Sequence, residues 1–325
     1  MAPALHHLAA AGIGPPAGEA TMKDTGPVLV PLDGSPLAER AVPVACALAR
    51  RWDAPVRLVH VHSALVPEPI YVEGLAVIDE HLRSQRREHE RAYMQQSRRL
   101  VEGTPVEAVI LEGRVAPALA AEARRSEAQL VVMTTHGRGG LERLWLGSVA
   151  DELAHGSPAP LLLLRPEEGA PAPAFHRVLV AVDGSAFADS VLGPATRVAQ
   201  PGAQLTLLTV VEPVAWTLRP TDLGMGVPGQ AEREGEAARQ LERAAEPLRS
   251  RGFDVRVRVA SADHVAACIL DTARDLDADL VAIATHGRSA VARAALGSVA
   301  DKVVRGAHRP VLLHRPHLEA GEPAP

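Results

Sequence analysis

Cysteine and lysine are both scarce in this chain of 325 residues. Its two cysteines, Cys46 and Cys268, lie in different halves of the sequence and form no C-x-x-C pair. This excludes a disulfide framework, argues against a structural zinc site and fits a reducing cytoplasm, where we expect the protein to reside. The only lysines are Lys23 and Lys302, so arginine carries nearly all of the positive charge. We interpret that as a compositional bias rather than a functional signal.

Long hydrophobic runs and a strong excess of one charge are also missing. No apolar stretch approaches the roughly 18 residues that span a bilayer. The first twenty residues lack a basic segment, and His6 and His7 interrupt them, so we expect no signal peptide. The net charge of −5 is mild, which argues against a nucleic-acid binder, and 47% hydrophobic residues can bury a core. We therefore expect neither a membrane nor a nucleic acid as a partner.

The chain contains the same pattern twice. Residues 135–151 read THGRGGLERLWLGSVAD and residues 285–301 read THGRSAVARAALGSVAD, an offset of 150 positions. The same offset separates Asp33 from Asp183, Pro160 from Pro310 and Arg165 from Arg315. Solenoid repeats are much shorter, about 20–50 residues, so this period indicates a duplicated domain. We predict a tail at 1–24, domains at 25–166 and 176–316, a Pro- and Ala-rich linker at 167–175, and a tail at 317–325.

Short apolar runs alternate with helical patterns in each unit. Strands are predicted at 26–33, 55–62, 105–113, 128–136 and 159–166, and again near 177–183, 204–211, 254–260, 279–285 and 310–315. Helices are predicted at 35–51, from about Leu75 through Ile78 and Leu82 to Val101, at 115–127 and at 148–156. Ser35 is expected as an N-cap, with Pro36 in the first turn. The alternation predicts an α/β fold with two Rossmann-like domains, each a five-stranded parallel sheet with helices on both faces.

Homologous units tend to reuse a self-complementary surface. We therefore expect the two units to form an intramolecular pseudo-dimer, joined by edge pairing of the fifth strands, 160–165 and 310–315. A further homodimer is left open.

The candidate site lies at the carboxyl ends of the strands, where open parallel sheets bind ligands. Asp33 ends the first strand, and the loop after the fourth strand ends in Gly147 and Ser148 at a helix start. Bare glycine backbone, helical N–H groups, the serine hydroxyl and Arg138 together suit a phosphate. The second unit repeats these features in Asp183, Arg288, Gly297 and Ser298. The alternative is that these glycines and serines only shape a strand end and cap a helix.

These loops resemble those of the universal stress protein family, which carry Gly, two residues, Gly, nine residues, then Gly and Ser or Thr. Nine residues separate Gly137 from Gly147, and nine separate Gly287 from Gly297. The resemblance covers 26–166 and 176–316, and it implies a tandem member with adenine nucleotide α-hydrolase-like domains. It also implies ATP as ligand. Residues that the resemblance places at the nucleotide are Asp33, Gly137, Gly147, Ser148, Asp183, Gly287, Gly297 and Ser298, with strand backbone near Val61 and Val210 at the adenine.

One feature departs from the family pattern. The first motif glycine is replaced by Thr134 in one copy and by Ala284 in the other. A Cβ at this position could crowd the ribose, so the departure favours a rival interpretation, a partner-interaction module of the same fold that binds no nucleotide.

Histidines offer further candidates. His60 and His62 share one face of a strand and could pair on a metal, but residues 150 positions later are Val210 and Glu212, so the units do not share the pair. His136 and His286 follow the fourth strands, where a loop hydrogen bond is the expected role.

The sequence therefore predicts a cytoplasmic stress-response regulator or adaptor that binds ATP, with Mg²⁺ or Mn²⁺ on the phosphates. No GxxxxGK[ST] loop or assigned base occurs, so we expect at most slow hydrolysis and a binding protein rather than an enzyme. A true enzyme of the same broad fold would need a flavin site or an additional catalytic domain, and the sequence shows neither.

Overall fold

The structure, a computed structural model, describes residues 26–63, 70–72, 75–77, 80–135, 146–165, 174–213, 229–285 and 296–315. The elements of the first half are β1 (Val28–Pro31), α1 (Pro36–Glu39), α2 (Ala41–Trp52), β2 (Val56–His62), β3 (Ile70–Val72), β4 (Leu75–Val77), α3 (Glu80–Ser97), the 3₁₀ turn η1 (Arg98–Leu100), β5 (Val106–Glu112), α4 (Val115–Arg125), β6 (Leu130–Thr134), α5 (Ser148–Gly156) and β7 (Leu161–Leu164). Those of the second half are β8 (Arg177–Ala181), α6 (Ala186–Asp189), α7 (Leu192–Val198), β9 (Gln204–Val211), α8 (Gln230–Ser250), β10 (Asp254–Ser261), α9 (Val265–Asp275), β11 (Leu280–Ala284), α10 (Ser298–Gly306) and β12 (Val311–His314).

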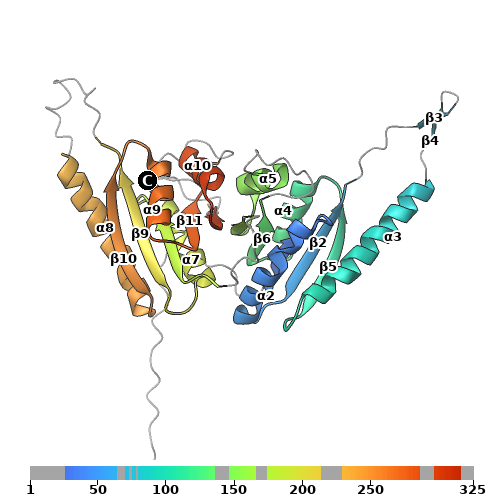
Figure 1. Cartoon of the computed structure of the whole chain (residues 1–325), viewed down its shortest axis with the longest axis horizontal. Helices are drawn as coiled ribbons and strands as arrows, with labels where there is room; N and C mark the ends of the chain where they lie inside the picture. The colour runs from blue at the N-terminus through green and yellow to red at the C-terminus, as the bar shows by residue number, and fades with distance from the viewer. Residues whose placement is uncertain are drawn as a thin grey trace, which may run out of the picture.

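The main strands form one continuous sheet of ten, in the order β10-β9-β8-β11-β12-β7-β6-β1-β2-β5 (Figure 1). Pairing is parallel within each half, which confirms the predicted α/β class and the two five-stranded parallel sheets. The central strands β6, β7, β11 and β12 are apolar and almost fully buried because helices cover both faces of the sheet.

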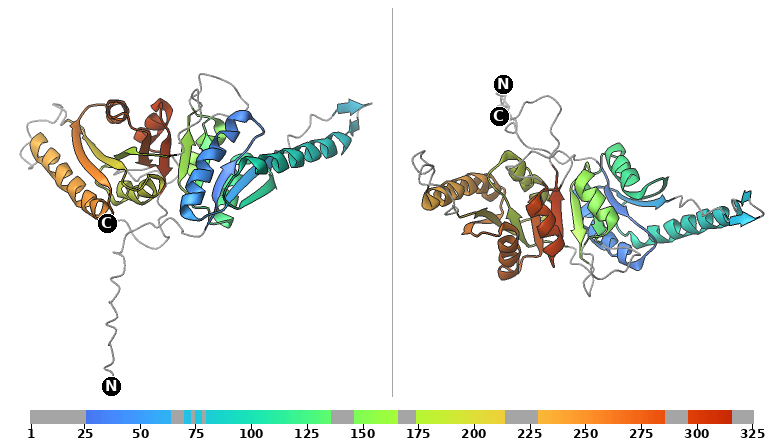
Figure 2. Two further views of the ribbon diagram at one scale, coloured as in Figure 1. Left: turned by 60° about the horizontal axis from the view of Figure 1, so that its bottom comes forward. Right: turned by 90° about the horizontal axis from the view of Figure 1, so that it is seen from above.

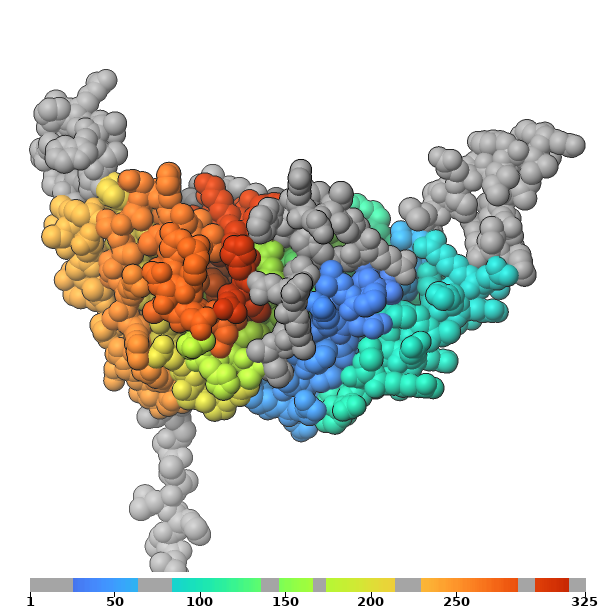
Figure 3. Space-filling view, in the orientation of Figure 1, coloured from blue at the N-terminus to red at the C-terminus, as the bar shows by residue number. Residues whose placement is uncertain are grey.

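The two halves meet at the antiparallel pair of β7 and β12, with Leu162 opposite Leu312. This confirms the predicted edge pairing and the intramolecular pseudo-dimer. Two arginines at the ends of these strands reinforce the junction: Arg165 donates to the carbonyl of Val304 in α10, and Arg315 donates to the carbonyl of His155 in α5. In the space-filling view the two halves are in contact at the middle of the molecule (Figure 3).

Two apolar layers sandwich the sheet. On one face the core contains side chains of α1, α2 and α3 together with those of α6, α7 and α8. On the other it contains side chains of α4, α5, α9 and α10. The helix α3 extends beyond the edge of the sheet, with β3 and β4 near its far end (Figure 1 and Figure 2).

Local signals explain how the first helix of each half begins. The Ser35 hydroxyl accepts the amide of Ala38 at 3.1 Å, and Ser185 accepts the amide of Ala188 at 3.2 Å. Pro36 occupies the first turn, as predicted. The predicted helix 35–51 is divided in two, since α1 ends at Glu39 and α2 begins at Ala41.

One helix prediction is wrong at its start. Leu75–Val77 is strand β4, antiparallel to β3, and the helix begins only at Glu80. Ile78, which also suggested helical spacing, lies outside the described residues. The β-branched and aromatic residues of Ile70–Val72 favour a strand, and a paired partner strand outweighs a short helical spacing.

Candidate functional site

The carboxyl ends of the strands in the second half surround a cavity of about 710 Å³. It is lined by residues that follow β8, by the end of β9, by the end of β11 and by the start of α10. The helices α6, α8 and α9 contribute the remaining wall. This is the edge at which parallel sheets of this topology bind ligands, and a cavity of this volume has room for a nucleotide.

The start of α10 supplies the polar end of this cavity. Its N-cap residue is Gly297 in an extended conformation (φ −59°, ψ 144°), which has no side chain to cap the helix. The Gly297 amide donates to the Thr285 carbonyl at 2.8 Å, which holds the start of α10 beside the end of β11. The amides of the first turn therefore face the cavity edge without a capping oxygen, which suits an anion.

The first half has the same arrangement. Gly147 is the extended N-cap of α5 (φ −68°, ψ 153°) and again has no side chain to cap the helix. Its amide donates to the Thr135 carbonyl at 2.7 Å. The duplicated turn thus has the same hydrogen bonding in both halves, and Ser148 and Ser298 begin the two helices.

The two aspartates after β1 and β8 shape the neighbouring loop. An oxygen of Asp33 accepts the Ser35 amide at 2.9 Å. An oxygen of Asp183 accepts the Ser185 amide at 3.0 Å and its hydroxyl at 2.6 Å. Burial, together with the charge of Asp183, raises the pKa of the nearby Asp189 above its ordinary value. The strand ends of the second half therefore carry two neighbouring carboxyl groups, those of Asp183 and Asp189.

The strand register corrects the numbering of the repeat. Val28 lies beside Val56 of β2, whereas its counterpart Val178 lies beside Leu205 of β9. The offset between equivalent residues of β2 and β9 is therefore one residue less than 150. Val61 and Val210 are therefore equivalent, and both face the α4 and α9 side of the sheet.

The same correction changes the histidine comparison. The counterpart of His60 is Thr209, not Val210, and the counterpart of His62 is Val211, not Glu212. Hydrogen bonds agree with this register. His60 Nδ1 lies 2.8 Å from the Leu32 carbonyl, and Thr209 Oγ1 donates to the equivalent Val182 carbonyl at 2.9 Å.

The structure brings four predicted residues of the second half to one cavity: Asp183, Val210, Gly297 and Ser298. Ala284, at the position of the missing motif glycine, lines this cavity too, and Thr134 is buried at the end of β6. Predicted residues that lie outside the described part of the chain are Gly137, Arg138, Gly287 and Arg288, together with His136 and His286.

Sequence reasoning missed two contributions. The helix α8 buries an apolar stripe, and its start also lines the cavity with Glu232, Arg233 and Glu236. In the first half, Glu90 of α3 reaches His60 and His62. Both depend on where a helix lies against a strand distant in sequence, so no local signal pointed to them.

Comparison with known proteins decides the family. The family model "Universal stress protein family" matches residues 25–165 and 174–315. The chain belongs to the universal stress protein family. A universal stress protein of Mycolicibacterium smegmatis is 29% identical, with 89% of this chain and 97% of that protein covered. One from Mycobacterium tuberculosis is 28% identical, with 91% and 97% covered.

Solved structures agree in fold. The crystal structure of a universal stress protein from Archaeoglobus fulgidus superposes with a TM-score of 0.63 at 18% identity, covering 91% of this chain and 97% of that one. A functionally unknown protein of Pseudomonas aeruginosa gives a TM-score of 0.58 at 17% identity, with 91% and 94% covered. This universal stress protein thus has two family domains in tandem. None of its described helices is both long and apolar enough to cross a membrane.

Proposed function

We propose that this tandem universal stress protein binds ATP or a closely related adenine nucleotide and acts as a stress-response regulator or adaptor in the cytoplasm. The observation that supports it is the cavity of about 710 Å³ at the strand ends, which joins Asp183, Val210 and the uncapped start of α10. Apolar side chains line one part of the cavity and helical amides another, as a base and a polyphosphate require.

Each part of the cavity has a proposed role. The first-turn amides of α10 and the Ser298 hydroxyl would donate to phosphate oxygens. Val210 and Ile269 offer an apolar surface to the base. Asp183 lies where ribose hydroxyls could donate to its carboxylate. We expect Mg²⁺ or Mn²⁺ to enter the site bound to the phosphates of the nucleotide.

The equivalent residues of the first half are proposed to act in the same way. These are Asp33, Val61, Gly147 and Ser148, and the loop residues Gly137, Arg138, Gly287 and Arg288 stay predictions of the sequence. The proposed role is binding with at most slow hydrolysis, because the residues assigned to the site position phosphates and none is assigned as a base.

Two measurements test the proposal. Mass spectrometry of small molecules released from the purified, denatured protein should detect an adenine nucleotide. Calorimetry of the nucleotide-free protein with ATP should then give a dissociation constant below about 1 mM. A folded protein that carries no nucleotide and binds none at that concentration would contradict the proposal and favour the partner-interaction module.

A further inference from the structure

A buried cluster of titratable side chains distinguishes the first half. His60 and His62 at the end of β2 and Glu90 on α3 are 7%, 9% and 8% exposed. His62 Nδ1 lies 2.7 Å from Glu90 Oε2, and His60 Nε2 lies 3.7 Å from Glu90 Oε1. One carboxylate therefore faces two imidazoles in a site largely closed to water.

The hydrogen bonds fix the tautomer of His60. A backbone carbonyl only accepts, so His60 Nδ1 must carry the hydrogen that it donates to Leu32. Its Nε2 is then the atom that can gain a proton, and that atom faces Glu90. Burial acts to raise the pKa of Glu90, but the hydrogen bond of His62 and the charges of His62, His60 and Arg86 hold it below its ordinary value. Glu90 is therefore ionised at neutral pH.

The cluster connects directly to the candidate site. Leu32, whose carbonyl accepts from His60, immediately precedes Asp33. Tyr93 of α3 lies edge-on to the His60 ring, with centroids 6.2 Å apart. Burial raises the pKa of Tyr93 to about 12, and the carboxylates of Glu39 and Asp33 contribute. Tyr93 therefore stays neutral at physiological pH, and its hydroxyl is buried near the carboxylates of Glu39 and Asp33.

Other charged groups surround the cluster on every side. Arg86 of α3 donates to Glu90 Oε1 at 3.2 Å. Glu112 of β5 is the register partner of His62 and pairs with Arg87 at 3.2 Å. Asp33 and Glu39 lie on the side of β1 and α1. The neighbouring carboxylates are thus those of Glu112, Asp33 and Glu39, and the neighbouring cations are Arg86 and Arg87.

The described residues of the second half contain no equivalent of this cluster. Thr209 makes the hydrogen bond equivalent to that of His60, by donating to the Val182 carbonyl, and Val211 replaces His62. The helix that covers this strand buries only apolar residues, which are Ala237, Leu241, Ala245 and Leu248. The two halves thus share the scaffold at this edge and differ in its titratable groups.

We propose that His60, Glu90 and His62 form a proton-binding site that makes the ligand affinity of the first half depend on pH, while the second half lacks this dependence. This inference rests on the proposed nucleotide function. With Glu90 ionised, each proton that the cluster takes up makes the edge more favourable to a polyphosphate. Because histidine gains its charge in the physiological range, affinity should rise as the pH falls from about 8 to about 6.

The experiment separates the two halves. Gly297→Val should prevent ATP binding to the second half, so that the affinity of the first half can be measured. Gly147→Val should do the reverse. Calorimetry with ATP at about pH 6 and about pH 8 gives one affinity ratio for each half, and protonation of ATP itself affects both ratios alike. We expect the ratio of the first half to exceed that of the second by about threefold to tenfold.

The second half supplies matched substitutions. His60→Thr with His62→Val, in the Gly297→Val protein, should reduce the ratio to that of the second half and retain binding at about pH 8. Titration of the histidine-containing protein in two buffers of different ionisation enthalpy gives an independent readout. Binding to the first half should take up more protons than binding to the second.

The outcomes are distinct. If the Gly297→Val protein is folded and binds no ATP at either pH, the proposed function of the first half fails and this inference fails with it. If it binds with the same pH ratio and proton uptake as the second half, only this inference is overturned.

Discussion

Leu162 of the first half and Leu312 of the second lie directly opposite each other at the centre of the sheet. They are the same residue of the two repeats, separated by 150 positions, so their contact marks the local twofold axis of the molecule. Both side chains are 0% exposed. The duplicated units are therefore joined by an isologous contact, as in a symmetric homodimer.

Truncation of this pair should be costly. Leu162→Ala or Leu312→Ala is expected to lower the free energy of unfolding by about 2–5 kcal/mol, through lost burial and the cavity that remains. The double variant should deviate from additivity because the two side chains are neighbours. Urea unfolding measures both effects. Leu100→Ala is the control, since Leu100 is 43% exposed. A cost at Leu162 no larger than that of the control would contradict an apolar junction.

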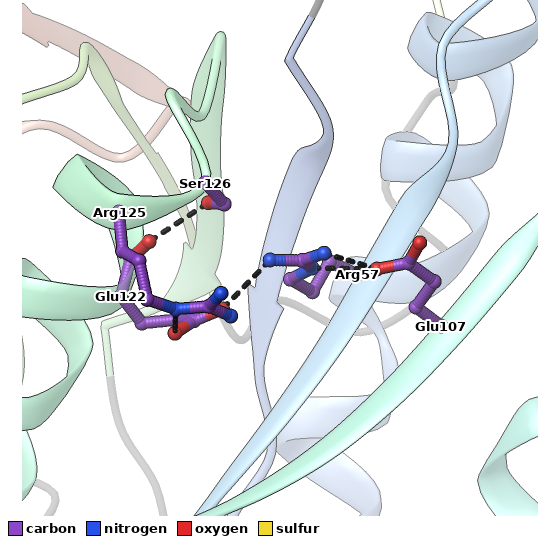
Figure 4. A network of polar contacts seen from close by, with 5 residues as sticks. All are labelled: Arg57, Glu107, Glu122, Arg125 and Ser126. Carbon is purple, nitrogen blue, oxygen red and sulfur yellow. Dashed lines mark hydrogen bonds and ion pairs between the residues drawn. The ribbon is translucent and has the colours of Figure 1, made fainter.

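An ion-pair network around the buried Glu122 should make stability depend on pH. Glu122 of α4 accepts from Arg57 at 2.8 Å and from Arg125 at 2.7 Å, and Arg57 also reaches Glu107 (Figure 4). Burial acts to raise the pKa of Glu122, but the hydrogen bonds of Arg125 and Arg57 hold it below the ordinary value. A depressed pKa adds stability above the unfolded-state pKa of about 4.3, and this stability is lost as the pH falls through the folded-state pKa.

Glu122→Gln is therefore expected to cost about 1–3 kcal/mol at neutral pH, and the difference from wild type should shrink below about pH 4. Glu107→Gln is the matched control, because that carboxylate shares Arg57 but its side chain is 53% exposed. Urea unfolding from neutral to acid pH measures both variants. Equal costs for the two glutamates at neutral pH would show that burial of Glu122 is unimportant.

A second contact between the halves involves Trp52 at the end of α2 and Arg197 at the end of α7. Trp52 Nε1 donates to the Arg197 carbonyl at 3.2 Å, and the Arg197 guanidinium lies 4.8 Å from the ring centroid. Trp52→Phe keeps a ring and should cost about 1 kcal/mol, whereas Trp52→Ala should cost about 2–3 kcal/mol. Thermal unfolding of the three proteins tests the order. Equal melting temperatures would mean that this contact adds nothing to the junction at Leu162.

The glycine at the start of α10 should be essential for the ligand and dispensable for the fold. Gly297 has a negative φ of −59°, which valine tolerates, so Gly297→Val should melt close to wild type without nucleotide. Its side chain would add bulk next to the first-turn amides and should reduce the ATP-induced rise in melting temperature to that of the first half alone.

Gly229→Val is the control for this variant. Gly229 is also an extended N-cap, and a Cβ there meets no atom within 4 Å. It should keep the full response to ATP. A Gly297→Val protein that also keeps the full response would remove the start of α10 from the site.

Much of the fold could be predicted from the sequence because its signals are local. The apolar runs predicted the strands, Ser35 and Pro36 predicted the start of α1, and the shared pattern of Leu161–Leu164 and Val311–His314 predicted the edge that joins the halves. The same local reasoning failed at Leu75–Val77, where pairing with β3 prevailed over helical spacing.

The sequence by itself determined the duplication, the alternation of strand and helix and the placement of Asp33, Gly147 and their counterparts at the strand ends, because each follows from residues that are close along the chain. Only the tertiary structure decided three features. These are the register that makes Thr209 the counterpart of His60, the approach of α8 to the cavity, and the contact of His62 with Glu90, 28 residues away. Those contacts depend on how a helix packs across a strand, and the packing is fixed by the shapes of both surfaces rather than by either segment alone.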